Sequence, residues 1–242
     1  MAVKKGDFIL VDYVGRVKQT GDLFDTTLQE VAKAENAYRE NEQYEPMLVA
    51  VGEGWVVEGL DEKLVELEPE KPATIEIPPE KAFGPRDPSK IRSIPLRRLR
   101  SQRITPVPGM QIEVDRRPAV IRSVGAGRVQ VDFNPALAGK TLVYEVTVRK
   151  VLDEKEEKMK ALLHRRFPSI DQAKFDIKTT KKKIAVTIPE ETFILEGLQY
   201  AKQGFFTDVK KFFPEFKELV FQETYKVEAV SYTHLRAHET VL

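Results

Sequence analysis

The chain has 242 residues, of which 41% are hydrophobic and 32% are charged, so a folded core is available and global disorder is excluded. Its net charge of +1 excludes a uniformly basic nucleic-acid binder, although a local basic patch is still compatible with it. The lack of cysteine excludes disulfide scaffolds, zinc–thiolate sites and cysteine nucleophiles. Because two of the 3 histidines are His234 and His238, close to the end of the chain, we expect no histidine-based metal site or catalytic triad.

Hydropathy argues against a membrane protein. The longest uncharged run, residues 104–112, contains two prolines and is far shorter than the roughly 20 apolar residues of a spanning helix. The first residues lack the apolar core of a secretory signal peptide. We therefore expect a soluble, cytoplasmic protein without membrane contacts.

The first 84 residues alternate strand signals with one helix signal. Runs rich in β-branched and aromatic residues predict strands, and apolar residues at helical spacing predict a helix that ends before Pro69. Strands are expected at 8–17, from 23, at 47–52 and at 73–79, a long loop with a helical turn or two at 28–43, and a short helix at 56–67.

The character of the chain changes between residues 86 and 131. This segment has eleven lysine and arginine residues against three acidic residues, a local charge of +8. It carries strand signals of its own at 112–114, 118–124 and 128–131, with a glycine-rich hairpin turn at 125–127. We interpret it as a small β-rich domain inserted into the first one. Residues 141–151 alternate cleanly and should return to the original sheet.

A third unit follows from residue 153. An acidic first turn predicts a charged helix, since negative charge is favourable at a helix N-terminus. Strands are expected at 175–180 and 183–188, a helix from Pro189, and a last strand from Leu219. The β-β-α-β order indicates a compact α+β domain. Residues 230–242 resemble a translated sequencing adapter, and we expect this tail to be non-native.

Sequence motifs for common enzyme chemistries are missing. Gly52 and Gly54 are followed neither by a third glycine nor by the lysine of a phosphate-binding loop, and no nucleophile elbow occurs. The acidic pair Glu190 and Glu191 is better explained as a charged helix end. What the strand ends do offer is aromatic and branched side chains that could line an apolar pocket.

Five phrases, taken together, resemble the FKBP-type peptidyl-prolyl isomerases, specifically the SlyD-like branch with an insert in its flap. They occur in family order over residues 3–151 and are found at 11–15, 21–26, 52–60, 77–84 and 133–146. The third unit is similar to the C-terminal domain of long archaeal members. The resemblance implies an α+β fold with an FKBP-like antiparallel sheet wrapped on a short helix. Its predicted parts are an isomerase domain (1–85 plus 132–152), an inserted flap domain (86–131) and a C-terminal ββαβ domain (153–229).

The resemblance also implies a site. Its catalytic residues would be Tyr13, Phe24, Asp25 and Tyr144, and its substrate-binding residues Met47, Val56, Val57, Leu60, Phe83 and Leu137. Val56 and Val57 stand where the family's backbone N–H binds the substrate carbonyl, and Leu60 stands where many relatives have tryptophan. Phe83 stands where many relatives have a hydrogen-bonding tyrosine. For the aromatic residues, core packing is the open alternative, and for Asp25 a structural turn cap.

The implied reaction is isomerisation of X–Pro peptide bonds in unfolded or nascent chains. It needs neither a covalent step nor a cofactor or metal, because the barrier of ~18–20 kcal/mol comes from amide resonance alone. An apolar pocket favours the twisted amide over the more polar planar one and orients the proline ring. The family's histidine-rich metal-binding tail is missing here.

In relatives the insert captures unfolded chains. Apolar residues interleaved with arginines would serve this purpose here: Ile91, Ile94, Leu96, Leu99, Ile104 and Val107. The alternative is that they form the core of the small domain. A basic insert also permits ribosome or RNA proximity, although residues 86–131 contain no aromatic residue for base stacking.

Two further alternatives stay open. Met47, Leu60 and Phe83 replace larger or hydroxylated pocket residues, which would suit a non-enzymatic holdase on the same fold. The third unit has a dense set of phenylalanines, which form either its core or a face for a homodimer: Phe205, Phe206, Phe212, Phe213, Phe216 and Phe221.

Overall fold

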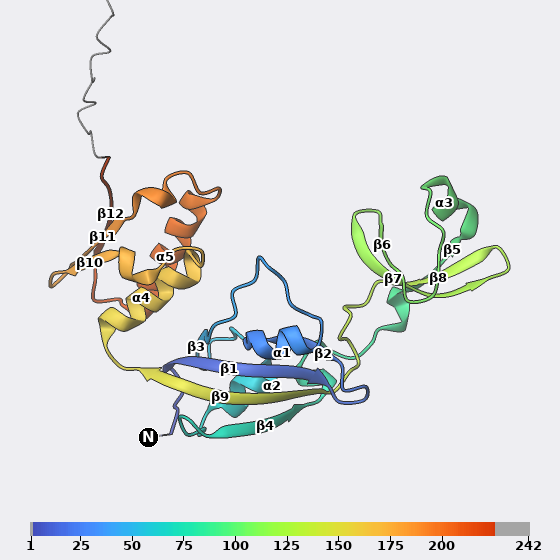
Figure 1. Ribbon diagram of the computed structural model, residues 1–242, viewed down its shortest axis with the longest axis horizontal. Helices are drawn as coiled ribbons and strands as arrows, with labels where there is room; N and C mark the ends of the chain where they lie inside the picture. Colours follow the sequence, from blue (N-terminus) through green and yellow to red (C-terminus); the bar gives the residue numbers. More distant parts are fainter. Residues whose placement is uncertain (1, 226–242) are drawn as a thin grey trace, which may run out of the picture. The chain divides into compact units, whose positions relative to one another are not determined.

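The computed structural model describes residues 2–225, and the predicted tail at 230–242 lies outside them. The chain divides into two compact units, Met1–Asp153 and Glu154–Leu242, and both combine helices with β-sheets (Figure 1). The fold class is therefore α+β, as expected. None of the helices formed by residues 2–225 has the length and apolar character that crossing a bilayer requires.

A five-stranded antiparallel sheet dominates the first unit. Its order is β2-β1-β9-β4, and β3 also pairs with β1. The strands are β1 (Phe8–Val17), β2 (Leu23–Thr26), β3 (Met47–Ala50), β4 (Pro72–Ile77) and β9 (Leu142–Leu152). Eight of the ten residues of β1 are buried because this strand lies in the middle of the sheet. The strands predicted in this part of the chain are all confirmed.

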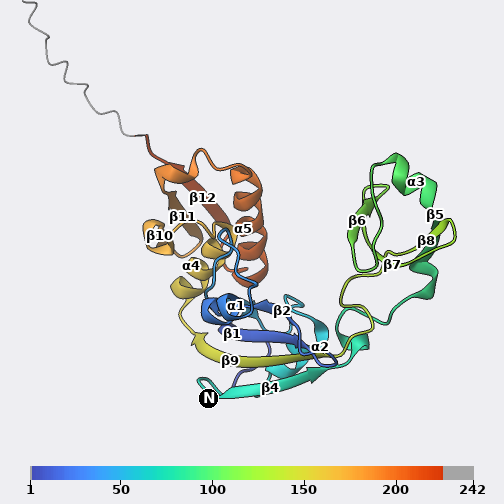
Figure 2. The same cartoon turned by 45° about the vertical axis from the view of Figure 1, so that its right-hand side comes forward.

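Two short helices accompany this sheet (Figure 2). They are α1 (Gln29–Ala34) and α2 (Glu58–Leu64), which contacts β4. Leu60 and Leu64 point from α2 into the core between helix and sheet. The helix predicted over 56–67 is shorter than expected, because Val65 is extended and Glu66 has a φ of 75°. A residue in the left-handed region cannot continue a right-handed helix.

The residues between β4 and β9 form a second, four-stranded sheet. We call it the insert sheet. All its neighbours are antiparallel in the order β5-β8-β7-β6 (Figure 2). Its elements are β5 (Ile91–Pro95), α3 (Leu96–Ser101), β6 (Gln111–Val114), β7 (Arg117–Gly125) and β8 (Arg128–Asp132). The three predicted strands are present, whereas β5 and α3 were not predicted. Both are short, and the proline and arginines within them obscure their patterns.

The second unit has a three-stranded sheet in the order β10-β11-β12, with β11 and β12 parallel. Its elements are α4 (Lys155–Arg166), β10 (Asp176–Thr179), β11 (Lys183–Ile188), α5 (Leu198–Phe212) and β12 (Glu218–Glu223). A parallel pair needs a crossover connection, and α5 supplies it. The predicted β-β-α-β order is confirmed.

The prediction of a helix that starts at Pro189 is wrong. Glu190–Thr192 form only a 3₁₀ turn, and α5 begins at Leu198. Gly197 separates the two with a φ of 84°, a conformation that ordinary residues rarely adopt and a helix cannot include. Of the six phenylalanines, Phe205 and Phe213 are buried in the unit, whereas Phe206 is 45% exposed.

Candidate active site

The two polar residues of the predicted site meet in the structure. The Tyr13 hydroxyl, on β1, donates a 2.6 Å hydrogen bond to Oδ2 of Asp25, on β2. Tyr13 is 9% exposed, while Asp25 lies at the surface. Burial, followed by the hydrogen bond to Asp25, raises the pKa of the Tyr13 hydroxyl well above its ordinary value. Tyr13 is therefore a neutral donor to the carboxylate of an exposed residue.

Two threonines hold this pair in place through the backbone of Tyr13. The Thr26 hydroxyl donates to the Tyr13 carbonyl at 2.9 Å, and the Tyr13 N–H donates to the Thr27 hydroxyl at 2.9 Å. Thr27 in turn donates to the buried carboxylate of Asp12, which Arg149 of β9 also binds at 2.7 Å. Since both threonines directly follow Asp25, these bonds set the position of its carboxylate relative to Tyr13.

Aromatic rings surround the hydroxyl. Tyr144 on β9 lies 5.9 Å from Tyr13 and 5.5 Å from Phe24, the latter in an edge-to-face arrangement favourable for aromatic pairs. Burial, and then the charge of Asp25, raise the pKa of Tyr144 to about 12. The Phe24 ring fits only because residue 15 is glycine: a Cβ there would lie 2.6 Å from Phe24 Cζ. The four predicted catalytic residues thus form one cluster.

Aliphatic side chains extend this cluster. Leu60 is 3% exposed and belongs to the buried core that includes both tyrosines. Met47, Val56, Val57 and Leu137 are half-buried and pack against that core. Among the residues described, the N–H of Val57 donates no hydrogen bond to another group of the chain. It is available at the position where the resemblance implies a bond to a substrate carbonyl.

One predicted residue, Phe83, does not join the cluster, and the single tryptophan of the chain lies away from position 60. Phe83 is 42% exposed, so its ring lies at the surface rather than among the buried rings. It follows a 3₁₀ turn, Pro79–Lys81, that carries the chain out of β4 toward the insert sheet. Trp55 packs edge-to-face on Phe8, with ring centroids 6.1 Å apart, and so does not replace the family's tryptophan at position 60.

The loop that carries Val56 and Val57 is held by a residue that sequence reasoning missed. Asp61, 8% exposed on α2, accepts the Gly52 N–H at 2.8 Å and the Gly54 N–H at 2.9 Å. Both glycines have positive φ, so their amides can turn toward the carboxylate. Asp61 lies in the first turn of α2, a position that only the later start of this helix, at Glu58 rather than residue 56, gives it.

The predicted client-binding residues of the insert divide between core and surface. Ile94 and Leu99 are buried in the core of the insert sheet, and Leu96 and Ile104 pack against it half-buried. Ile91 is half-buried at the start of β5. For Ile94 and Leu99 the expected binding role is corrected: their exposed areas of 7% and 0% leave no surface for a client. The large exposed apolar residues here are Val107, Met110 and Val124.

Comparisons with known proteins point to one family. Family models described as "FKBP26, IF domain" and "FKBP26_C-terminal" match residues 92–137 and 155–226. A short-type peptidyl-prolyl cis-trans isomerase of Methanocaldococcus jannaschii is 38% identical over 155 residues, covering 64% of this chain and 98% of the relative. The chain belongs to the FKBP-type peptidyl-prolyl cis-trans isomerases.

Two further FKBP-type relatives come from bacteria. The isomerase SlyD of Treponema pallidum is 32% identical, covering 47% of this chain and 66% of the relative. A 16 kDa FKBP-type isomerase of Escherichia coli is 26% identical, covering 44% of this chain and 74% of the relative. The predicted resemblance to an insert-containing FKBP with an additional C-terminal region is thus confirmed.

Proposed function

We propose that this FKBP catalyses cis–trans isomerisation of X–Pro bonds in unfolded or nascent chains. The observation that carries the proposal is the hydrogen bond between Tyr13 and Asp25 beside the rings of Phe24 and Tyr144. An apolar cluster with one polar pair on its rim suits a proline ring whose flanking amide must rotate. The names of the relatives support the same activity.

In this proposal the proline ring packs over Leu60 between the aromatic rings. The Val57 N–H binds a substrate carbonyl, which fixes one side of the bond while the other side turns. Removing water from the planar amide disfavours it relative to the twisted amide, whose charge separation is smaller. Asp25, with Tyr13 as its donor, orients the rotating group. No bond to the protein forms and no proton leaves the substrate.

The insert sheet is proposed to capture clients, and the domain layout is part of this proposal: isomerase domain 1–85 plus 132–152, insert 86–131 and C-terminal domain 153–229. Support for capture comes from Val107, Met110 and Val124, which expose 56%, 39% and 39% of their surfaces. Exposed apolar side chains among arginines suit an extended chain whose own apolar groups are unfolded. Client binding would therefore use this exposed set rather than Ile94 and Leu99.

Ribosome or RNA proximity is a weaker part of the proposal. Six of the ten arginines between residues 86 and 131 contact acidic, hydroxyl or aromatic partners within the chain: Arg86, Arg92, Arg98, Arg117, Arg122 and Arg128. Phosphate binding would compete with these contacts.

Homodimer formation through the C-terminal unit is supported by Ile194 and Tyr200, which are 90% and 86% exposed. Sedimentation of the full chain measures its oligomeric state.

The first experiment compares two substrates. The full chain is expected to accelerate isomerisation of a short X–Pro peptide and the refolding of a protein limited by proline isomerisation. Deleting residues 86–131 should leave peptide activity and greatly reduce refolding activity. Asp25→Ala should reduce both. If the full chain is inactive on the peptide but still prevents aggregation, the holdase alternative is correct and the enzymatic proposal is wrong.

A further inference from the structure

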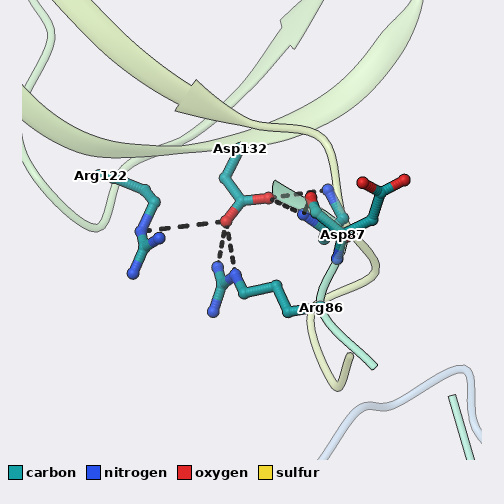
Figure 3. A network of polar contacts seen from close by, with 5 residues as sticks. Arg86, Asp87, Arg122 and Asp132 are labelled. Atoms are coloured by element: carbon teal, nitrogen blue, oxygen red, sulfur yellow. Dashed lines mark hydrogen bonds and ion pairs between the residues drawn. The ribbon is translucent and has the colours of Figure 1, made fainter. Parts of the chain in front are cut away.

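A buried carboxylate joins the two segments that connect the insert sheet to the first sheet. Figure 3 shows Asp132, the last residue of β8, among its polar partners. Its exposed fraction is 1%. Its Oδ2 accepts from Nε of Arg86 at 2.8 Å and also from Nη2 of the same guanidinium. Arg86 lies on the outgoing connection and Asp132 on the returning one, 46 residues later. We call these two segments, residues 84–90 and 132–139, the neck.

The second oxygen of Asp132 extends the same network. Oδ1 accepts from the backbone N–H of Asn134 at 2.9 Å and from its Nδ2 at 2.7 Å. The Asn134 side chain then reaches across the neck: Oδ1 accepts the Asp87 N–H, and Nδ2 donates to the Asp87 carbonyl, both at 2.9 Å. The carboxylate of Asp132 and the amide of Asn134 therefore join the returning segment to Arg86 and Asp87 of the outgoing one, and every polar atom of these two side chains has a partner.

The neck lies directly beside two predicted substrate-binding residues. Phe83 precedes the outgoing segment, and Leu137 lies on the returning one, where it packs half-buried against the core of the first sheet. A backbone bond from Gly139 N to Gly84 O, at 2.8 Å, closes the neck at the same end. Residue 139 has a φ of 74°, and a Cβ there would lie 3.1 Å from Arg86 Cβ. The paired segments are therefore closely packed up to the edge of the predicted site.

We propose that Asp132 is a positioning residue for delivery of captured clients to the prolyl site, acting by holding the two segments of the neck together. This inference rests on the proposed function, because it presumes capture by the insert. A paired neck restricts how far a client held on the insert can move from the site, which raises the effective concentration of its X–Pro bonds there. A short peptide does not use the insert, so its turnover does not depend on the neck.

The ion pair suits this role because only one of its two residues is buried: Asp132 is buried, whereas Arg86 is exposed. Burial by itself would raise the pKa of Asp132, but the hydrogen bonds from Asn134 and Arg86 outweigh it and hold that pKa below the ordinary value. Asp132 is thus ionised at neutral pH. Arg122 of β7 adds a second positive charge at 3.9 Å. Removing the charge of Asp132 would leave both guanidinium groups facing an uncharged group.

The test uses the full chain and three variants. Asp132→Asn removes the charge with little change of shape, and Arg86→Gln alters the exposed partner, which allows a conclusion if Asp132→Asn folds poorly. Asp115→Asn is the matched control: it breaks the Arg98–Asp115 ion pair in the same insert, where both side chains are exposed. We expect the KM for proline-limited refolding to rise about tenfold in the two neck variants, the effect of losing one charge-assisted bond. Peptide kcat/KM should stay within about twofold of wild type, a factor well below that change.

Amide hydrogen exchange provides a readout that does not depend on activity. Exchange at Asp87 and Asn134 should accelerate in the neck variants, while the core of the insert sheet is unchanged. Unaltered refolding KM in both neck variants would overturn the inference. It would also be overturned if peptide and refolding activities fell together, or if exchange rose throughout the insert, since either result indicates a merely structural role. A wild-type chain inactive on peptides would contradict the proposed function instead, and neck-specific exchange would then decide this inference.

Discussion

The Tyr13 hydroxyl and the Asp25 carboxylate are joined by a 2.6 Å hydrogen bond across neighbouring strands, from a buried residue to an exposed one. The pairing of Val14 with Thr26 and of Gly15 with Asp25 places these side chains at the same end of the strand pair. The bond orients a carboxylate that solvent would otherwise leave free to rotate. Its contribution to catalysis can be separated from its contribution to stability.

A double-mutant cycle isolates the effect of this bond. Tyr13→Phe keeps the ring and removes the donor, and Asp25→Ala removes the acceptor. Each should lower peptide kcat/KM about tenfold, since a hydrogen bond to a charged group contributes roughly 1.5–3 kcal/mol. The double variant should be little worse than either single one, because both remove the same interaction. Asp22→Ala, at an exposed carboxylate on the preceding turn, serves as control and should retain full activity. Additive losses would contradict a shared role.

The raised pKa values of the tyrosines predict how stability depends on pH. The unfolded pKa of tyrosine is about 10, while that of Tyr144 in the folded chain is about 12. The protonated folded state is therefore favoured fully below pH 10, and this advantage is lost as the pH rises toward 12. Urea unfolding across this range measures the loss.

Ultraviolet titration of tyrosinate should show that Tyr13 and Tyr144 ionise late. Tyr144→Phe should remove one of these late groups and flatten the alkaline decline in stability. If Tyr13→Phe and Tyr144→Phe each remove a group that titrates near the ordinary pH of about 10, the burial of this pair is wrong.

Gly15→Ala is expected to disturb the site without removing any of its side chains. The added methyl would lie 2.6 Å from Phe24 Cζ, so the ring must move away from Tyr144. We expect a clear loss of peptide kcat/KM together with altered NMR shifts of the Phe24 and Tyr144 rings. Gly125→Ala, where the nearest atom lies at 4.0 Å, is the control. Unchanged activity in Gly15→Ala would argue against a role for Phe24.

Asp61→Ala should loosen the loop that presents Val56 and Val57. Two loop amides lose the buried carboxylate that accepts from them, which costs about 1–3 kcal/mol of stability, and amide exchange at Gly52 and Gly54 should accelerate. Because the loop positions the Val57 N–H, the KM for peptides should rise more than kcat falls. Asp61→Asn keeps one accepting oxygen and should have an intermediate effect. Glu62→Ala, the exposed neighbour that pairs with Lys81, is the control.

A matched pair of variants separates core from client surface in the insert. Leu99→Ala removes a fully buried side chain and should destabilise the insert sheet by about 2–5 kcal/mol. Val107→Ser, at a residue that is 56% exposed, should change stability by less than about 0.5 kcal/mol. It should nevertheless weaken binding of an unfolded client, measured by fluorescence anisotropy. Undiminished client binding in Val107→Ser would exclude this residue from the capture surface.

Much of the fold could be predicted from the sequence. Alternating β-branched residues identified β1, β4 and β9, because a strand's side-chain period is local information. The order of five short phrases indicated the family, and with it the four residues of the polar and aromatic cluster. Short elements such as α3 were not predicted, because six residues that include three arginines show no distinct hydrophobic periodicity. The delayed start of α5 depended on the conformation of a single glycine, Gly197.

Tertiary structure alone decided which residues meet and which are covered. Leu99 and Val107 have the same apolar character in the sequence, yet packing of four strands and a short helix buries one and exposes the other. Asp61, Asp132 and Asn134 are common polar residues until the fold brings distant amides or guanidinium groups to them. The sequence by itself determined most of the strands, with β5 as the exception, and also the family and the chemistry available. Partners separated by up to 137 residues, as for Arg149 and Asp12, required the three-dimensional fold, because burial and hydrogen bonding are properties of neighbours in space.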